Sequence, residues 1–137
     1  MATKEEIIAF IARDFPQAKC AVVQVGDRGA TVCHEVGTAE LRPGGTVSGP
    51  VLMATADMAL YVAILGEIGI VPLTVTTSLN INFLRKPKAN ARVLGVCRLI
   101  KLGRTLAVGE VSLYSEGSSE VVAHAVGTYA IPAKNVA

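Results

Sequence analysis

The chain has 137 residues, 51% of them hydrophobic and 18% charged, with a formal net charge of +2. This length suits one domain with a single core, and the apolar content excludes an intrinsically disordered chain. The three cysteines, Cys20, Cys33 and Cys97, lack metal-ligand spacing, which favours buried reduced thiols in a cytoplasmic protein. The N-terminus has no basic region followed by a long apolar run, so we expect no secretory signal.

The first half of the chain predicts a short helix and two strands. Residues 3–6 read Thr-Lys-Glu-Glu, a capping-box pattern that predicts an amphipathic helix over residues 4–13. Two strands are expected over residues 19–25 and 30–35, because the Gly-Asp-Arg-Gly segment between them is typical of a tight turn. A loop rich in glycine and proline is expected over residues 40–49.

A long helix is predicted over about residues 50–66, with Ser48 as its N-cap and Pro50 as its first residue. It is apolar on nearly every face, so it must be covered on most sides. Residues 50–70 approach the length of a membrane span. Acidic residues and a glycine interrupt this stretch, however, and strands follow it, so we expect no membrane association.

Four further strands are expected over residues 74–83, 91–100, 105–115 and 121–131. In the first of them apolar and polar side chains alternate, with Val75, Leu79, Ile81 and Phe83 against Thr76, Ser78, Asn80 and Asn82. With one apolar helix and six strands, the simplest arrangement is an α+β fold in which a curved antiparallel sheet wraps around the helix. Its open edges favour dimerisation by strand pairing.

Asp57 is the most informative residue. It is the only acidic or basic residue between Pro50 and Leu65, and no Lys, Arg or His lies within ten residues of it. Burial of an unpaired carboxylate is costly, so such a residue is usually paired, hydrogen-bonded or functional. Asp57 is therefore the first candidate for catalysis. The alternative is an acid near a helix end that reaches water.

Three segments carry a resemblance to a known family. They are Gly45-Thr46-Val47-Ser48-Gly49-Pro50 running into Thr55-Ala56-Asp57-Met58-Ala59, then Asn80-Ile81-Asn82-Phe83-Leu84-Arg85-Lys86-Pro87, and Leu102-Gly103-Arg104-Thr105-Leu106-Ala107. Together they resemble the PaaI-like acyl-CoA thioesterase family of hotdog-fold proteins. The resemblance implies a single hotdog domain over residues 1–137, with an N-terminal helix over 1–18, a core over 19–132 and a tail over 133–137.

The chain also departs from that family. The family pattern is approximately Asn-x-x-Gly-x-x-His-Gly-Gly, with Ala-Asp about eight residues after the first glycine of the triplet. Arg42 stands at the Asn position, Ser48 at the His position and Pro50 at the second glycine, whereas Gly49 and Asp57 match. The function therefore stays open between an acyl-CoA thioesterase, a non-catalytic acyl-CoA or acyl-carrier binding module and, in third place, a hotdog dehydratase.

Thioester hydrolysis requires a stabilised carbonyl oxygen and an activated nucleophile. The Gly49 amide at a helix N-terminus suits the first task, and Asp57 suits the second, as a general base or as the nucleophile. Eight residues of helix separate them by about 12 Å, so one carbonyl carbon cannot contact both within a subunit. The resemblance implies the same composite site, at a homodimer interface. We expect a dimer or a dimer of dimers.

Several polar residues are candidates to bind the substrate. Thr76, Thr77, Asn80 and Asn82 are candidates to orient the water or the thioester, or else they form the polar face of a strand. Tyr61 lies one turn after Asp57 and is a candidate to line the acyl pocket or to donate a hydrogen bond, with a core position as the alternative. Arg42 and Ser48, at the two departing positions, are further candidates.

The second half of the chain is basic. Residues 71–137 contain eight of the 13 Lys and Arg residues but only three of the 11 Asp and Glu residues. This bias indicates an anionic partner, and the phosphates of coenzyme A would be bound by Arg85, Lys86, Lys88, Lys101 and Arg104. The alternative is a solvated strand face. The basic residues are not interleaved with aromatic ones, so we expect no nucleic-acid partner.

Neither His34 nor His124 has a partner at metal-ligand spacing. Both are expected to be structural, and no metal or cofactor is expected besides coenzyme A in the substrate. Three Phe, three Tyr and no Trp predict a poor supply of side chains for an aromatic cage around a phenylacyl group. A small or medium acyl group is expected, and the sequence does not identify it.

Overall fold

The computed structural model describes residues 1–133 of the chain. Its elements are α1 (Lys4–Asp14), β1 (Cys20–Gly26), β2 (Gly29–His34), β3 (Leu41–Arg42), β4 (Thr46–Val47), α2 (Gly49–Ile68), β5 (Val75–Phe83), β6 (Val93–Leu102), β7 (Leu106–Ser115) and β8 (Val121–Ala130), with a 3-10 turn at Thr38–Glu40. Most of the predicted tail, residues 134–137, lies outside the described residues. The division of the chain into domain parts stays a prediction.

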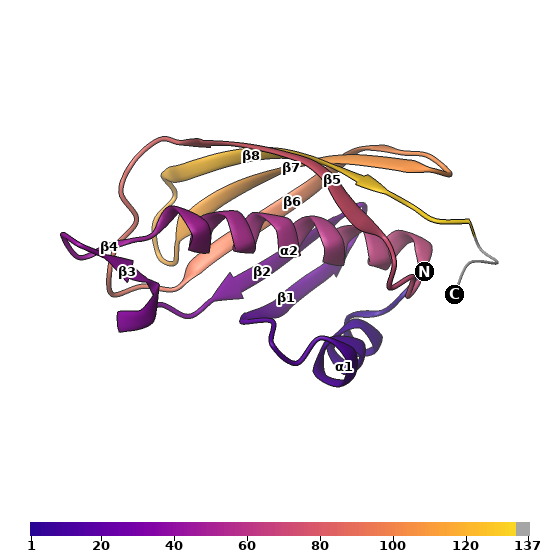
Figure 1. The fold of residues 1–137 in the computed structure, drawn as a ribbon, viewed down its shortest axis with the longest axis horizontal. Coiled ribbons are helices and arrows are strands. Elements are labelled where there is room, and N and C mark those ends of the chain that lie inside the picture. The colour runs from indigo at the N-terminus through magenta and orange to yellow at the C-terminus, as the bar shows by residue number, and fades with distance from the viewer. Residues whose placement is uncertain (134–137) are drawn as a thin grey trace.

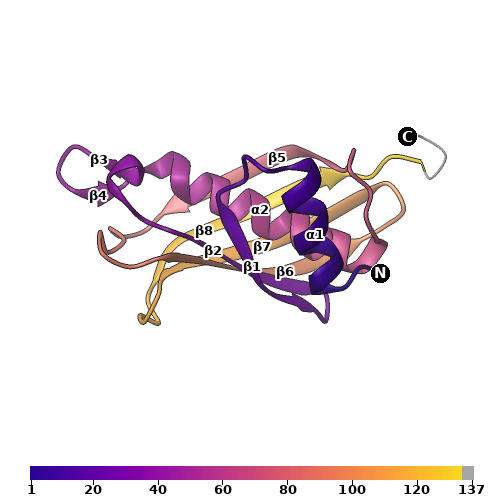
Figure 2. The same cartoon turned by 90° about the horizontal axis from the view of Figure 1, so that it is seen from below.

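Six strands form one antiparallel sheet in the order β1-β2-β6-β7-β8-β5. The sheet curves around α2, which packs mainly against β6 and β2 (Figure 1). Seen from below, α1 crosses the C-terminal half of α2 on the side away from the sheet (Figure 2). The predicted α+β hotdog arrangement, an antiparallel sheet around one long helix, is therefore confirmed. β1 and β5 are the two edges of this sheet.

The central helix lies very close to the sheet. From Thr55 to Gly66 every residue of α2 is buried except Asp57, which is partly exposed. Leu60 fits against Gly109 and Gly127, which face each other on β7 and β8. A Cβ atom at Gly109 would lie only 2.7 Å from a Leu60 methyl group, so only glycine permits this approach. The helix is long and apolar enough to cross a membrane, but 61% of that stretch is buried, as in a core helix.

The predicted loop over residues 40–49 contains a small hairpin that sequence analysis did not anticipate. β3 and β4 pair in it as a separate two-stranded sheet, next to the start of α2 (Figure 1). Gly44 and Gly45 form its turn with φ of 97° and 76°, which other residues rarely adopt. The chain thus passes from this hairpin directly into the N-terminus of α2.

A β-bulge in β5 changes which side chains face the helix. Thr76 pairs with Tyr129, but the next pair begins at Ser78, so Thr77 is an extra residue in the strand. Sequence analysis grouped Thr76 with Asn80, and that grouping was wrong. Ahead of the bulge the alternation reverses, and Thr76 faces α2 while Asn80 lies on the outer surface of the sheet.

Candidate functional site

The Asp57 carboxylate is held by two hydroxyl groups. The Thr76 hydroxyl donates to Oδ1 at 2.7 Å, and the Tyr129 hydroxyl lies 2.6 Å from the same oxygen and 2.9 Å from the backbone carbonyl oxygen of Asp57. Both contacts to Oδ1 have the length of charge-assisted O–H···O⁻ hydrogen bonds. The partners of the Asp57 carboxylate are therefore neutral donors from β5 and β8.

Tyr129 is a stable donor. Its side chain is buried, and burial together with the neighbouring Asp57 carboxylate raises the pKa of the Tyr129 hydroxyl well above its usual range. The hydroxyl therefore keeps its proton throughout the neutral range. Sequence analysis did not identify Tyr129. Its position opposite Thr76 in the last strand becomes visible only once the register of β5 and β8 is known.

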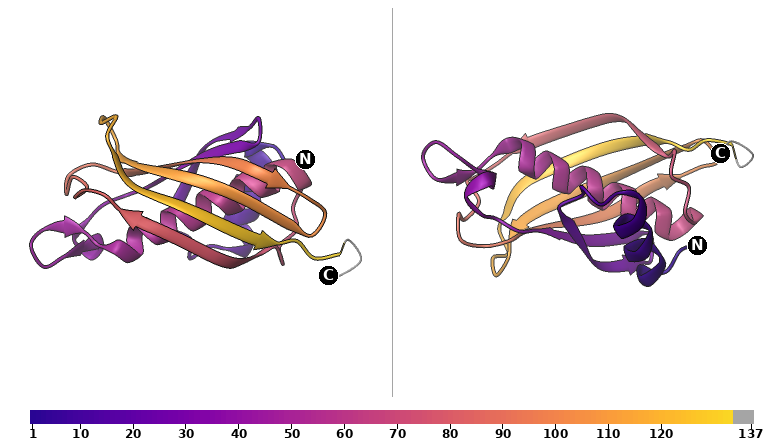
Figure 3. Two further views of the ribbon diagram at one scale, coloured as in Figure 1. Left: turned by 90° about the horizontal axis from the view of Figure 1, so that it is seen from above. Right: turned by 60° about the horizontal axis from the view of Figure 1, so that its bottom comes forward.

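Asp57 lies on the wall of a cavity of about 660 Å³ that follows the exposed face of α2. α1 and the start of β1 form one side of this cavity, and the start of β5 forms the other; Figure 3 shows this side of α2 in its right panel. Four of the six aromatic residues of the chain line it, namely Phe10, Phe15, Tyr61 and Tyr129. The Tyr61 ring lies 6.4 Å from that of Phe10 and 6.2 Å from that of Tyr129. The fold gathers most of the rings in one place, and the expected scarcity of side chains for an aromatic cage around a phenylacyl group stays a prediction.

Tyr61 lies in this cavity as a buried residue, and its hydroxyl donates to the carbonyl oxygen of Pro72 at 3.1 Å. Burial raises the pKa of the Tyr61 hydroxyl. Cys20 is also on the cavity wall, and burial raises the pKa of its thiol to about 11. At neutral pH Cys20 is therefore a thiol, which is a poor nucleophile.

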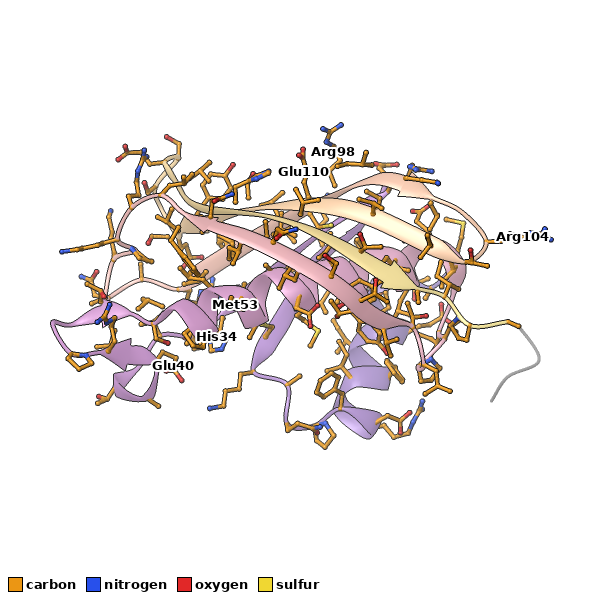
Figure 4. All side chains as sticks on the ribbon, turned by 45° about the horizontal axis from the view of Figure 1, so that its top comes forward. His34, Glu40, Met53, Arg98, Arg104 and Glu110 are labelled. Carbon is orange, nitrogen blue, oxygen red and sulfur yellow. The ribbon has the colours of Figure 1, made fainter. Side chains whose placement is uncertain are left out.

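His34 also lines the cavity, although sequence analysis treated it as structural. It is buried, and its Nδ1 lies 2.7 Å from the carbonyl oxygen of Glu35. Because a carbonyl oxygen only accepts, Nδ1 carries a proton. His34, labelled in Figure 4, shares the cavity wall with Ala54 and Met58 of α2. His124 is on the outer face, 3.4 Å from Glu110. Within residues 1–133 no group of three His, Cys, Asp or Glu side chains could hold a metal ion.

Gly49 is the first residue of α2, where backbone N–H groups have no partner within the helix. A Cβ atom there would lie 3.4 Å from the Phe83 ring, so the end of β5 meets the helix N-terminus. Ser48 occupies the N-cap position, and its side chain makes no capping hydrogen bond. Arg42 is exposed on β3, opposite Thr46.

The remaining candidates lie apart from Asp57 within one subunit. Asn80 and Asn82 pair with Val126 and His124 on the outer face of the sheet. The exposed Thr77 donates its hydroxyl to the carbonyl oxygen of Thr128 at 3.2 Å. The structure thus brings only Thr76 and Tyr61, of the predicted polar set, into the cavity with Asp57.

The five basic candidates fall into two groups. Arg85, Lys86 and Lys88 are in the connection between β5 and β6, at the end of the molecule where α2 begins (Figure 1). Lys101 and Arg104 are at the hairpin between β6 and β7, at the other end of the sheet, where Figure 4 labels Arg104. Arg85 also forms an ion pair with Glu120 at 3.0 Å. One subunit therefore does not gather all five residues.

The comparisons with known proteins agree with this architecture. The family model of the thioesterase superfamily matches residues 44–122, which include both Gly49 and Asp57. No curated protein matches the chain. A candidate thioesterase from Silicibacter sp. is 41% identical, with 96% of this chain and 92% of that protein covered and a TM-score of 0.87.

Two further solved structures are PaaI proteins. A variant of the phenylacetic acid degradation protein PaaI from Thermus thermophilus is 28% identical, with 86% of this chain and 97% of that one covered and a TM-score of 0.74. PaaI from E. coli is 18% identical, with 94% and 92% covered and a TM-score of 0.82, a likeness that shows the fold alone. The family model, which matches more than half of the chain, and the 41% identity show that this protein belongs to the thioesterase superfamily.

Proposed function

We propose that this protein hydrolyses the thioester of an acyl-CoA, with Asp57 as the group that activates water. One observation carries the proposal: a carboxylate held by two hydroxyls on the wall of a cavity rich in aromatic side chains. A fixed carboxylate beside an apolar pocket suits general-base catalysis on a bound acyl group. The membership of the chain in the thioesterase superfamily supports the same reaction class.

In the proposed reaction Asp57 takes a proton from water as the water oxygen bonds to the thioester carbonyl carbon. The carbonyl oxygen becomes an oxyanion, which backbone N–H groups at a helix N-terminus stabilise. The oxyanion then re-forms the carbonyl, the carbon–sulfur bond breaks, and the coenzyme A thiolate leaves. The thiolate takes up the proton that Asp57 accepted, so the products are a carboxylic acid and a thiol and the carboxylate is regenerated. The alternative has Asp57 attack the carbonyl carbon directly and expel the thiolate, which gives a mixed anhydride that water then hydrolyses. A single turnover in isotopically labelled water detects this route when water attacks the aspartyl carbon of the anhydride, because the label then enters Asp57 and the first acid product is unlabelled.

The oxyanion donor and the base are proposed to come from two copies of the chain. Gly49 and Asp57 are eight residues apart on one continuous helix, about 12 Å along its axis. A second copy with an antiparallel α2 would bring its own Gly49 amide near this Asp57. The open edge strand β5, with exposed Val75 and Phe83 at its ends, supports this pairing.

Coenzyme A is proposed to bind at the end of the molecule where α2 begins. Arg85, Lys86 and Lys88 lie in the connection that follows β5, whose last residue, Phe83, lies against Gly49. Cations at this end would attract the phosphates of the nucleotide and direct the thioester toward a helix N-terminus. Lys101 and Arg104, at the other end of the sheet, would contact the same coenzyme A only if another subunit brought them there.

The acyl group is proposed to enter the cavity beside Asp57. The Tyr61 ring lies next to those of Phe10 and Tyr129 there, and aromatic walls favour flat or branched apolar groups. Small and medium acyl groups are the proposed occupants of this cavity of about 660 Å³. A phenylacyl-CoA should be among the first substrates tested, because the similar Thermus protein is named a phenylacetic acid degradation protein.

A panel of acyl-CoA thioesters with detection of free thiol tests the proposal. We expect turnover of at least one small, medium or aromatic acyl-CoA, and loss of that turnover in D57N. Binding of an acyl-CoA without any hydrolysis would instead support a binding module. The replacement of two family residues by Arg42 and Ser48 makes that second function worth testing directly.

A further inference from the structure

The two hydroxyls that hold Asp57 both point at one of its oxygens. Thr76 and Tyr129 lie 2.7 Å and 2.6 Å from Oδ1, and within residues 1–133 no side chain donates to Oδ2. We infer that Tyr129 is a positioning residue which, together with Thr76, anchors Oδ1 and leaves Oδ2 as the oxygen that acts on the substrate or on water. The inference rests on the proposed function, in which Asp57 is the catalytic carboxylate.

The position of Tyr129 itself is firmly fixed. The residue is 3% exposed, belongs to a strand that is paired on both sides, and packs its ring against Tyr61. Its hydroxyl lies within hydrogen-bond distance of both the backbone carbonyl oxygen and Oδ1 of Asp57. A rotation of the Asp57 side chain about its Cα–Cβ bond would break the second contact. Tyr129 therefore sets the direction in which Oδ2 points.

Thr76 completes the anchor from the neighbouring strand. It is directly opposite Tyr129 in the β5–β8 pairing, and the bulge at Thr77 brings its side chain onto the face of the sheet toward α2. Without the bulge, the Thr76 side chain would follow the phase of Asn80 and lie on the outer surface. The strand irregularity thus has a definite role, which is to aim a second hydroxyl at Asp57.

Other polar side chains of the cavity leave the orientation of Asp57 to these two hydroxyls. Asp14, Lys19, Cys20, His34 and Tyr61 line the same cavity. Within the described residues none of these five forms a hydrogen bond to Asp57, whereas Thr76 and Tyr129 do. The direction of the Asp57 carboxylate should therefore depend on these two hydroxyls.

The test compares two single-oxygen deletions in buried tyrosines of the same cavity. Y129F removes the hydroxyl that contacts Asp57, and Y61F removes one that contacts only the Pro72 carbonyl oxygen. We expect Y129F to lower kcat by about 10- to 100-fold and to leave KM near the parent's value, because the Tyr129 hydroxyl is proposed to act through Asp57. Y61F should lower kcat far less, whatever it does to KM. An unchanged kcat in folded Y129F, or an equal loss of kcat in Y61F, would overturn the inference.

The exposed Thr76 gives a second arm that holds even if Y129F fails to fold. T76V should lower kcat in the same way, and T76S, which keeps the hydroxyl, should restore it. A T76V kcat equal to the parent's would contradict the inference. If the parent hydrolyses no thioester, the proposed function fails, but crystal structures of Y129F and T76V still decide. An Asp57 carboxylate that keeps its orientation in both variants would overturn the anchoring role by itself.

Discussion

Thr76 and Tyr129 are opposite each other in the β5–β8 pairing, and their hydroxyls reach the same carboxylate oxygen of Asp57. Within residues 1–133 the carboxylate is thus stabilised by neutral donors and not by a cation. Neutral donors are little affected by ionic strength, whereas the proposed phosphate contacts are screened by salt. We therefore expect salt to act on substrate binding more than on the chemical step.

Replacement of Asp57 by asparagine should remove most thioesterase turnover while the protein stays folded. The amide keeps the shape of the side chain and an acceptor for Thr76 and Tyr129 but cannot take a proton from water. A general base is typically worth about 10²- to 10⁴-fold, and kcat measured by free-thiol release should fall by that factor. Thermal unfolding and acyl-CoA binding serve as controls. Hydrolysis at the parental rate would exclude Asp57 as catalyst.

Charges on the β5 edge should separate the proposed dimer and inactivate it. Val75 and Phe83 are 51% and 53% exposed on this edge strand, and V75K/F83K would put unpaired ammonium groups into an interface. Light scattering should show a monomer, and turnover should disappear with the dimer. V23K places a single lysine on the opposite edge strand, β1, and should stay dimeric. A parent that is monomeric at micromolar concentration would contradict the composite site.

Charge reversal at Arg85 and Lys86 should raise KM more than it lowers kcat. Contacts to the nucleotide are similar in the ground state and the transition state, so their loss weakens both equally. K101E/R104E makes the same charge change at the far end of the sheet and should raise KM less. Steady-state kinetics at two salt concentrations provide the measurement. An unchanged KM in R85E/K86E would indicate that Arg85 and Lys86 contact only solvent and do not bind coenzyme A.

Gly127 should be intolerant of even one methyl group. A Cβ atom there would overlap the Leu60 side chain, whereas one at Gly103 would meet only ordinary contacts. We expect G127A to lower the free energy of unfolding by about 1–3 kcal/mol and G103A to change it little. Denaturant unfolding measures both. Equal stability of the two variants would show that α2 can move away from the sheet without cost.

Periodicity predicted most of the fold because each element carries a local pattern. The capping box at Thr3 to Glu6 forms as expected, and α2 extends only a little beyond the predicted helix. The β3–β4 hairpin was missed because each of its strands has two residues, too few for an alternation to show. Gly49 and Asp57 lie on α2 as predicted, and their catalytic roles stay predictions.

The anchor of Asp57 could not be predicted in the same way. Tyr129 is 72 residues from Asp57, and the sequence pattern assigns it only to one face of a strand. Thr76 was assigned to the wrong face because no local signal marks Thr77 as an extra residue. Pairing registers are set by contacts across the whole sheet, so the partners of Asp57 emerge only from the tertiary structure.

The bulge at Thr77 sets how far the Thr76 hydroxyl lies, in sequence, from the apolar residues of β5 that face the helix. Thr76 and Ser78 oppose adjacent residues of β8, so deletion of Thr77 would leave a regular strand in which Thr76 still faces the helix opposite Tyr129. A strand that kept every residue but lost the bulge would instead turn Thr76 outward and lose one of the two donors. Among related sequences, a hydroxyl three residues before the position of Leu79 would therefore require a bulge, whereas one two residues before it would reach the carboxylate from a regular strand.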